Sequence, residues 1–157
     1  MSNVARFTKR FNPAIPRGMR IFERDVVVEG VEFHRYYAKK FVLRSKQGIY
    51  LEREPDNRHD PNLIRVMGKA KSWLLVMNKC IGYVPADIAM HLVESGIEDK
   101  VQVHLREVSV GRRSHIGISF DVLGPQEDYC KYRSQPADSP LDSRLLTVAG
   151  IARKKAA

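Results

Sequence analysis

The segment from Leu51 to Val66, LEREPDNRHDPNLIRV, places ligand-type side chains between two apolar, strand-like runs. Carboxylates, amides and an imidazole follow one another there, and all three groups can bind metal ions. A calcium loop is excluded, because a loop that starts at Asp56 has Pro61 where glycine is required and Met67 where the closing glutamate belongs. A metal-dependent nuclease would need carboxylates that converge from several elements. We therefore predict no metal site, no catalytic residues and no cofactor.

Two interpretations of this segment stay open on the residues alone. Pro55 and Pro61 fix the backbone at both ends, and the Asp and Asn side chains can bond nearby backbone N–H groups, which predicts a rigid turn. Such a turn does not need Arg58 and His59 at its tip. A guanidinium and a flat ring beside fixed carboxylates can hold a phosphate, stack a base and accept a hydrogen bond from a sugar hydroxyl. The end of a nucleic-acid strand offers all three groups.

The composition is that of a folded, basic protein. The 157 residues include 43% hydrophobic and 29% charged residues, and the net charge is +9. This length suits one domain with a core. The positive excess favours an anionic partner, nucleic acid or an acidic membrane surface, and an ordinary solubilising surface would produce it as well.

Sequence features also indicate a compartment. No apolar run reaches the roughly 20 residues of a membrane span, and the first residues lack the apolar centre of a signal peptide. Cys80 and Cys130 lack the paired spacing of a zinc site and fit a reduced interior. We therefore expect a cytoplasmic protein, nucleoid-associated if bacterial, without a membrane partner.

The middle of the chain is typical of β-structure. Apolar and β-branched runs predict strands over 24–33, 48–54, 62–67, 72–77 and 79–84, and alternation predicts a hairpin over 101–123. Pro85 and Gly96 bound the clearest helix. Trp73 lies among apolar residues and is expected in the core. Many short strands with one or two helices predict a mainly β fold, a small OB-like or SH3-like β-barrel, closed or nearly so.

Three regions divide the chain. Residues 1–22 show no sustained period and predict a basic, flexible N-terminal arm, which either follows a phosphate backbone or is simply a loose terminus. Residues 23–124 form the predicted barrel domain. Residues 125–157 form a C-terminal extension, in which a short helix from about Leu141 docks on the body or on a partner.

Two basic clusters outside the opening segment suit an anionic ligand. The segment 33–46, FHRYYAKKFVLRSK, interleaves aromatic rings with Lys39, Lys40 and other cations, as do surfaces that stack bases and track a phosphate backbone. The same pattern suits an amphipathic connector whose rings are buried. Arg112 and Arg113 lie at the tip of the predicted hairpin, where they either contact phosphates or keep the turn soluble.

The opening segment belongs to a longer pattern that resembles the HIRAN domain. That family is marked by a stretch R-E-P-x-N-x-H/Y-D-x-N-A-I-x-V and then by I-G-Y-V/L-P leading into a helix. This chain has REPDNRHDPNLIRV at 53–66 and IGYVP at 81–85, and VVVEGVEF at 26–33 is similar to the opening strand of the family. The resemblance covers roughly residues 26 to 123. It implies an OB-like fold. HIRAN domains occur fused to SNF2-type helicases and nucleases and also as small stand-alone proteins.

The resemblance also implies roles for individual residues. In helicase-linked members the domain captures the 3′ end of single-stranded DNA. By motif, Asp60 would accept a hydrogen bond from the terminal 3′-hydroxyl, and His59 and Phe33 would flank the base of the end nucleotide. Asn57 would fix the loop or a base edge, and Tyr83 would approach the phosphates or the base.

The chain departs from the helicase-linked pattern at the pocket. Glu32 stands where that pattern has an arginine, and Pro85, Ala86 and Asp87 replace lysines just beyond the tyrosine of the second motif. We therefore expect weaker phosphate binding inside the pocket, with basic residues outside it as compensation.

These observations predict a non-enzymatic DNA-binding module that recognises single-stranded DNA or 3′ ends, as an accessory of a larger DNA-processing or defence assembly. The alternative is a protein-interaction subunit that docks onto a helicase, nuclease or ribonucleoprotein complex, which an apolar face on 141–152 would favour. The predicted nucleic-acid-binding residues are Phe33, Asn57, Arg58, His59, Asp60, Tyr83, Lys39, Lys40, Arg112 and Arg113.

Overall fold

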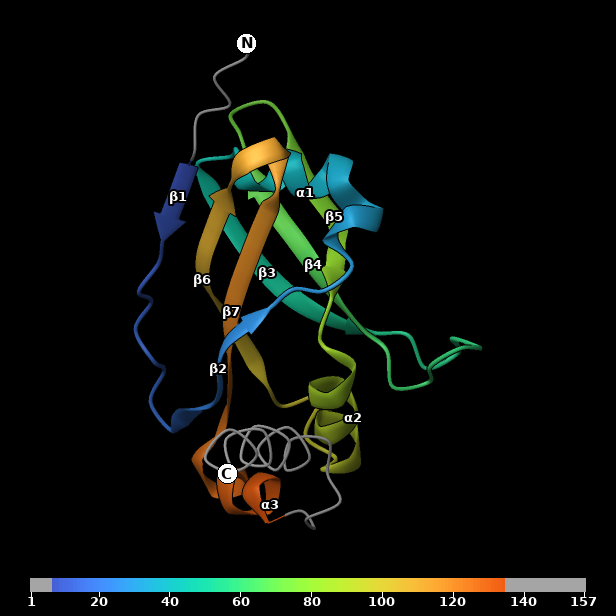
Figure 1. Cartoon of the computed structure of the whole chain (residues 1–157). Helices are drawn as coiled ribbons and strands as arrows, with labels where there is room; N and C mark the ends of the chain where they lie inside the picture. Colours follow the sequence, from blue (N-terminus) through green and yellow to red (C-terminus); the bar gives the residue numbers. More distant parts are fainter. Residues whose placement is uncertain (1–6, 135–157) are drawn as a thin grey trace, which may run out of the picture.

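Two antiparallel sheets make up most of the protein, as the computed structural model shows (Figure 1). It describes residues 7–134. One sheet has the strand order β1-β6-β7-β2 and the other β3-β4-β5. The strands are β1 Phe7–Arg10, β2 Met19–Val27, β3 Lys46–Arg53, β4 Ile64–Lys71, β5 Val76–Tyr83, β6 Gln102–Val110 and β7 Ile116–Pro125. The helices are α1 Arg35–Val42, α2 Ala86–Glu94 and α3 Tyr129–Arg133, with 3₁₀ turns η1 Val31–His34, η2 Arg112–Ser114 and η3 Gln126–Asp128.

The mainly β, OB-like class predicted from the sequence is confirmed, with two differences. The described residues hold three short helices, and their two sheets do not close into a barrel. The sheets meet through an isolated backbone bridge between Glu29 and Tyr83 and otherwise pack through side chains. A closed barrel would need a continuous ladder of hydrogen bonds at that place.

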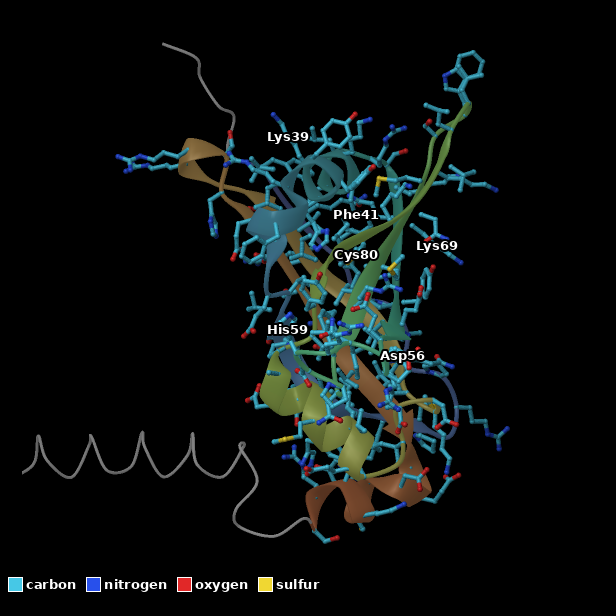
Figure 2. All side chains as sticks on the ribbon, turned by 90° about the vertical axis from the view of Figure 1, so that its right-hand side faces the viewer. Lys39, Phe41, Asp56, His59, Lys69 and Cys80 are labelled. Atoms are coloured by element: carbon cyan, nitrogen blue, oxygen red, sulfur yellow. The ribbon has the colours of Figure 1, made fainter. Side chains whose placement is uncertain are left out.

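The core lies between the sheets and follows the alternation of the strands. On β4, Ile64, Val66 and Ala70 are buried, whereas the intervening side chains face outward. Phe41 of α1 packs directly over Gly68 of the same strand, where an added Cβ would lie 2.9 Å from the ring. Glycine at 68 therefore lets the helix close the upper end of the core (Figures 1 and 2).

Helix α1 combines the two interpretations that the sequence left open for 33–46. Ala38, Phe41 and Val42 are buried, which makes this face of the helix part of the core. Tyr36 and the two lysines that follow it on the helix face solvent, and Tyr36 is 64% exposed. The helix is therefore both an amphipathic connector and a carrier of exposed rings and cations.

The N-terminal segment contributes two strands to the described fold, which differs from the flexible arm expected over 1–22. β1 pairs with β6 from Phe7 opposite Val110 to Arg10 opposite Glu107, and β2 begins at Met19. β1 has only four residues and no inward-facing apolar side of its own. Its stability comes from a partner strand roughly a hundred residues away, so local periodicity could not reveal it.

The prediction that Trp73 lies in the core is wrong. Lys71 pairs with Val76, so residues 72–75 form the turn of the β4–β5 hairpin and not a strand. Trp73 is 92% exposed. The hairpin extends past the body of the protein (Figure 2), and no other element covers its tip. An apolar run in the sequence carries no information about whether the rest of the fold reaches it.

The C-terminal part continues the fold beyond the predicted domain end. Tyr132 of α3 is fully buried, with its ring centroid 5.1 Å from that of Phe22 and 4.2 Å from that of His91. Its hydroxyl donates to Oε1 of Glu23 at 2.7 Å, and the backbone carbonyl of Tyr132 bonds Nε2 of His91. The helix predicted from about Leu141 lies outside the described residues.

Replacement of Tyr132 tests whether α3 belongs to the folded unit. We expect Tyr132→Ala to lower the free energy of unfolding by about 3–5 kcal/mol, because it removes a buried aromatic ring. Tyr132→Phe removes only the hydrogen bond to Glu23 and should cost about 1 kcal/mol. Urea denaturation of both variants measures this, with the exposed Tyr36→Ala as the control. An unchanged midpoint for Tyr132→Ala would show that α3 is not part of the cooperative unit.

Candidate nucleic-acid interface

Two of the three family-like segments, the opening strand 26–33 and IGYVP at 81–85, meet at the bridge between the sheets. The Glu29 N–H donates to the Tyr83 carbonyl at 2.9 Å, and the Tyr83 N–H donates to the Glu29 carbonyl at 2.8 Å. This exchange joins the segment after β2 to the last residue of β5. Segments 26–33 and 81–85, about fifty residues apart in the chain, thereby form one surface.

Two glycines allow this close approach. An added Cβ on Gly82 would lie 2.4 Å from Cγ1 of Val28 and 2.6 Å from the Glu29 carbonyl oxygen. Gly30 has a φ of +69°, and a Cβ there would lie 2.9 Å from the Tyr83 ring. Its left-handed conformation ends the predicted strand over 24–33 early and turns the chain into η1. Phe33 therefore stands on a 3₁₀ turn and not on a strand.

A groove of about 600 Å³ lies along this junction. Most of the residues that line it are apolar or glycine, and two carboxylates, those of Glu29 and Glu32, also belong to the lining. The β6–β7 hairpin supplies one side, η1 and the end of β2 another, and the start of α2 closes it. The lining residues are Val27, Val28, Glu29, Gly30, Val31, Glu32, Phe33, Leu63, Tyr83, Val84, Ala86, His115, Ile116 and Gly117.

Tyr83 lines the groove, and its hydroxyl is neutral and bonded to a neighbouring histidine. A hydrogen bond of 3.0 Å joins this hydroxyl to Nε2 of His34, and the two rings meet edge to face. Burial, with smaller contributions from Cys80 and Glu54, raises the pKa of the Tyr83 hydroxyl above its usual range. Burial likewise raises the pKa of the Cys80 thiol, whose sulfur lies 3.8 Å from the same imidazole nitrogen. The phenol and the thiol therefore stay protonated and uncharged near neutral pH.

The polar loop 54–63 leaves the side of the body between β3 and β4 (Figure 1). Asn57 organises it from within. Oδ1 of Asn57 accepts hydrogen bonds from the backbone N–H of His59 at 2.9 Å and of Asp60 at 3.1 Å. Oδ1 of Asp60 in turn accepts from the Asn62 N–H at 2.9 Å. The backbone of this loop is therefore the turn, held by Asp and Asn side chains, that the first interpretation of the sequence predicted.

Strand residues hold the loop from both ends. Nδ2 of Asn57 donates to Oε2 of Glu54 at 3.1 Å, and the other carboxylate oxygen of Glu54 pairs with Arg65 at 3.0 Å. Arg65 also pairs with Glu52 on the neighbouring strand. On the other side, Arg53 donates to the Pro61 carbonyl at 3.1 Å. The loop is thus anchored to the second sheet at both of its ends, and its shape is set before any ligand arrives.

The predicted site residues fall into two adjoining groups. Phe33 and Tyr83 line the groove, and Phe33 is 80% exposed. Asn57, Arg58, His59 and Asp60 lie in the loop and are not part of the groove lining. The connection is Leu63, which lines the groove and donates its N–H to the Asp60 carbonyl at 3.2 Å. Figure 2 shows His59 and Asp56 on this loop, on the side of the molecule that faces the viewer.

The predicted cations lie beyond the other end of the groove. Lys39 and Lys40 are exposed on α1, and Lys39 stands at the top of the molecule (Figure 2). Arg112 and Arg113 are exposed on η2, the tip of the β6–β7 hairpin. Arg35, at the start of α1, donates to the Arg113 carbonyl at 3.4 Å and so links the two elements.

Sequence reasoning missed three features of the groove. His115 was assigned no role, yet it lines the groove from the β6–β7 hairpin. Glu29 supplies the backbone bridge, and Gly117 of β7 also lines the groove. None has a signal in local sequence, because strand pairing over long range brings them to the site. Among residues 7–134, no three His, Cys, Asp or Glu side chains gather to hold a metal ion.

Comparison with known proteins identifies the family. Residues 24–125 match the HIRAN domain, so this chain belongs to the HIRAN domain family. Among solved structures it is similar to the crystal structure of the HIRAN domain of human HLTF, with 18% sequence identity and a TM-score of 0.44. That match covers 73% of this chain and 87% of the other. No curated protein matches, and none of the described helices is long and apolar enough to cross a membrane.

Substitution of Gly82 tests the close approach that forms the groove. We expect Gly82→Ala to lower the free energy of unfolding by about 2–4 kcal/mol, because its Cβ overlaps Val28 and the Glu29 carbonyl. Gly48→Ala is the matched control, since that glycine is also in a strand and has no atom within 4 Å of the added Cβ. Guanidinium denaturation compares them. Equal stability of the two variants would contradict the packing described for the bridge.

Proposed function

We propose that this chain is a non-enzymatic DNA-binding module that holds the 3′ end of a single strand at the groove and the adjoining loop. The observation that supports it most is the junction of the opening strand, 26–33, with the second motif, 81–85. The Glu29–Tyr83 bridge puts the exposed Phe33 ring and Tyr83 together in a groove that adjoins a loop already shaped by Asn57. A preorganised site of this kind loses little entropy on binding.

Stacking is the first contribution. Phe33 is exposed and lines the groove, and His59 is exposed on the adjoining loop. A base that enters between these two elements can stack on the phenylalanine ring and meet the imidazole on its other side. Each base stacked on an aromatic ring contributes about 1–3 kcal/mol to single-strand binding.

Recognition of the end is the second contribution, and Asp60 supplies it. One carboxylate oxygen, Oδ1, accepts the Asn62 N–H, and Oδ2 has no hydrogen-bond partner among the described residues. That oxygen can accept a hydrogen bond from a 3′-hydroxyl. A 3′-phosphate would instead place negative charge against the carboxylate, so the site discriminates between the two ends.

Charge sets the path of the phosphates. Glu29 and Glu32 stand at the groove, whereas the cations lie on α1 and η2 at its far end. Phosphates are therefore expected along Lys39, Lys40 and the two η2 arginines, and the terminal nucleoside near Phe33. In this arrangement the replacement of the family's arginine by Glu32 moves phosphate binding out of the pocket.

The wider role is part of the same proposal. HIRAN domains occur beside SNF2-type helicases and nucleases, and this supports an accessory role in a DNA-processing or defence assembly in the cytoplasm. A helicase or nuclease is the partner class that such a role implies.

End recognition is tested by fluorescence anisotropy with a labelled single strand that carries either a 3′-hydroxyl or a 3′-phosphate. We expect the wild type to bind the hydroxyl end about tenfold more tightly, as one hydrogen bond to a charged group allows. Asp60→Asn keeps an oxygen for the Asn62 N–H but loses the negative acceptor, and it should remove this preference.

Asp56→Asn is the matched control, because it removes the same charge from an exposed position of the same loop. It should leave the preference unchanged. If wild type and Asp60→Asn bind both ends equally, the loop is scaffolding and the proposed end recognition is wrong.

The salt dependence of binding tests the path of the phosphates. For single strands, the slope of log K against log salt changes by about 0.7 for each phosphate contact. The double variant Arg112→Gln/Arg113→Gln should therefore flatten the slope by up to about 1.4. Lys100→Gln is the control, since that exposed lysine lies beyond α2 and pairs with Asp128. A slope that the double variant leaves unchanged would exclude η2 from the interface.

A further inference from the structure

The tip of the β4–β5 hairpin exposes four apolar side chains in a row. The exposed fractions are 92% for Trp73, 69% for Leu74, 64% for Leu75 and 70% for Val76. The turn closes on itself, with the Ser72 N–H donating to the Leu75 carbonyl at 2.9 Å. An apolar surface of this kind, held clear of the body (Figure 2), indicates an interaction site.

Lysines surround the base of this tip. Lys71 is paired with Val76, and Lys46 of β3 is the residue opposite Lys71 on the next strand. Lys69 lies two residues further along the same face of β4, and Figure 2 shows it below the hairpin. All three lysines are exposed. The hairpin therefore presents an apolar centre with a cationic rim.

The stem below the tip alternates cations with aromatic rings. The Lys69 ammonium lies 4.7 Å from the centre of the Tyr50 ring, and the Lys79 ammonium lies 5.4 Å from that of Tyr37. Binding to a lipid surface would require only the apolar tip and the cations. Aromatic rings interleaved with cations suit a nucleic-acid strand, because bases stack on the rings while phosphates meet the cations, and here Tyr37 is exposed and Tyr50 partly exposed. The partner that these features favour is nucleic acid.

We propose that this hairpin tip is a second DNA contact, in which Trp73 and its aliphatic neighbours pack on the end base pair of a duplex. The end of a duplex is a flat, apolar surface with phosphates at its edge, and it complements an apolar tip with a lysine rim. One indole ring has enough area to stack on a single base. The adjacent leucines extend the apolar surface to the width of a pair.

The position of the tip relates it to the groove. Tyr83 and Val76 are the two ends of β5, seven residues apart, which corresponds to about 23 Å at about 3.3 Å per residue. Stacked nucleotides advance by about 3.4 Å each, so about seven of them span this distance. A duplex with a 3′ overhang of about seven nucleotides can therefore reach both sites. This spacing rests on the proposed function, whereas the contact of the tip with a duplex end does not.

Intrinsic fluorescence reports directly on the tip, because Trp73 is the one tryptophan of the chain. The probes are a hairpin duplex with a 3′ overhang, a blunt hairpin duplex, an unstructured single strand, and vesicles of phosphatidylserine and phosphatidylcholine. We expect both duplexes to quench the emission through stacking, and the single strand to quench it less. No quenching by either duplex would overturn the proposal, as would a blue shift on vesicles or on concentrating the protein alone.

Variants measure the contribution of the tip by anisotropy. Trp73→Ala should weaken binding of the overhang duplex about tenfold, within the range of one lost stacking contact, and Trp73→Phe should restore most of it. Ile15→Ala is the control, since it removes an apolar side chain that is 49% exposed in another loop. Unchanged affinity of the alanine variant at Trp73 would overturn the proposal.

The two proposals fail in different ways. If Asp60→Asn abolishes the preference for a 3′-hydroxyl while a blunt duplex still quenches Trp73, both proposals stand. If the wild type shows no 3′-hydroxyl preference but the blunt duplex quenches Trp73, the tip contact stands without the end pocket. If the preference is present and neither duplex affects Trp73, the end pocket stands and the tip contact is wrong.

Discussion

Two backbone hydrogen bonds between Glu29 and Tyr83 hold the sheets in one relative position, and the groove depends on them. Continuous pairing at this place would have closed a barrel and filled the surface with a hydrogen-bond ladder. A single bridge instead joins the sheets at one point and leaves a recess beside it. Gly82 makes the bridge possible, because any side chain there would occupy the space of Val28. The groove is thus present because the two sheets are joined by one bridge and not by a continuous ladder.

The loop beside the groove illustrates a second constraint, in which strands determine the shape of an exposed segment. Asn57 is bonded to Glu54, and Glu54 is paired with Arg65 of β4. Because that arginine also pairs with Glu52, the loop shares its supports with the outer face of the sheet. Short polar side chains shape the turn, and long charged ones fix its position on the body. The function proposed for the loop tip therefore depends on residues that would not touch a ligand.

Local pattern predicted the parts of the fold that local interactions build. The β6–β7 hairpin, the helix after Pro85 and the strands around the polar loop follow from alternation and capping residues. β1 could not be found in this way, because its order comes from pairing with β6. Trp73 was misplaced for the complementary reason, since burial depends on whether other elements reach a residue. Family resemblance indicated Phe33 and Tyr83, whereas His115 enters the groove through pairing of distant strands.

The lysines near the hairpin have a consequence for the solubility of the protein. β3 and β5 are the outer strands of their sheet, and apart from the Glu29–Tyr83 bridge at the end of β5, their outer edges have no strand partner in the described fold. Exposed edges favour pairing with other molecules, and an apolar tip nearby would favour it further. Lys46 on β3 and Lys79 on β5 place a charge on each edge strand. Such charges oppose sheet-to-sheet aggregation and so counteract the tendency of the exposed apolar hairpin to bring chains together.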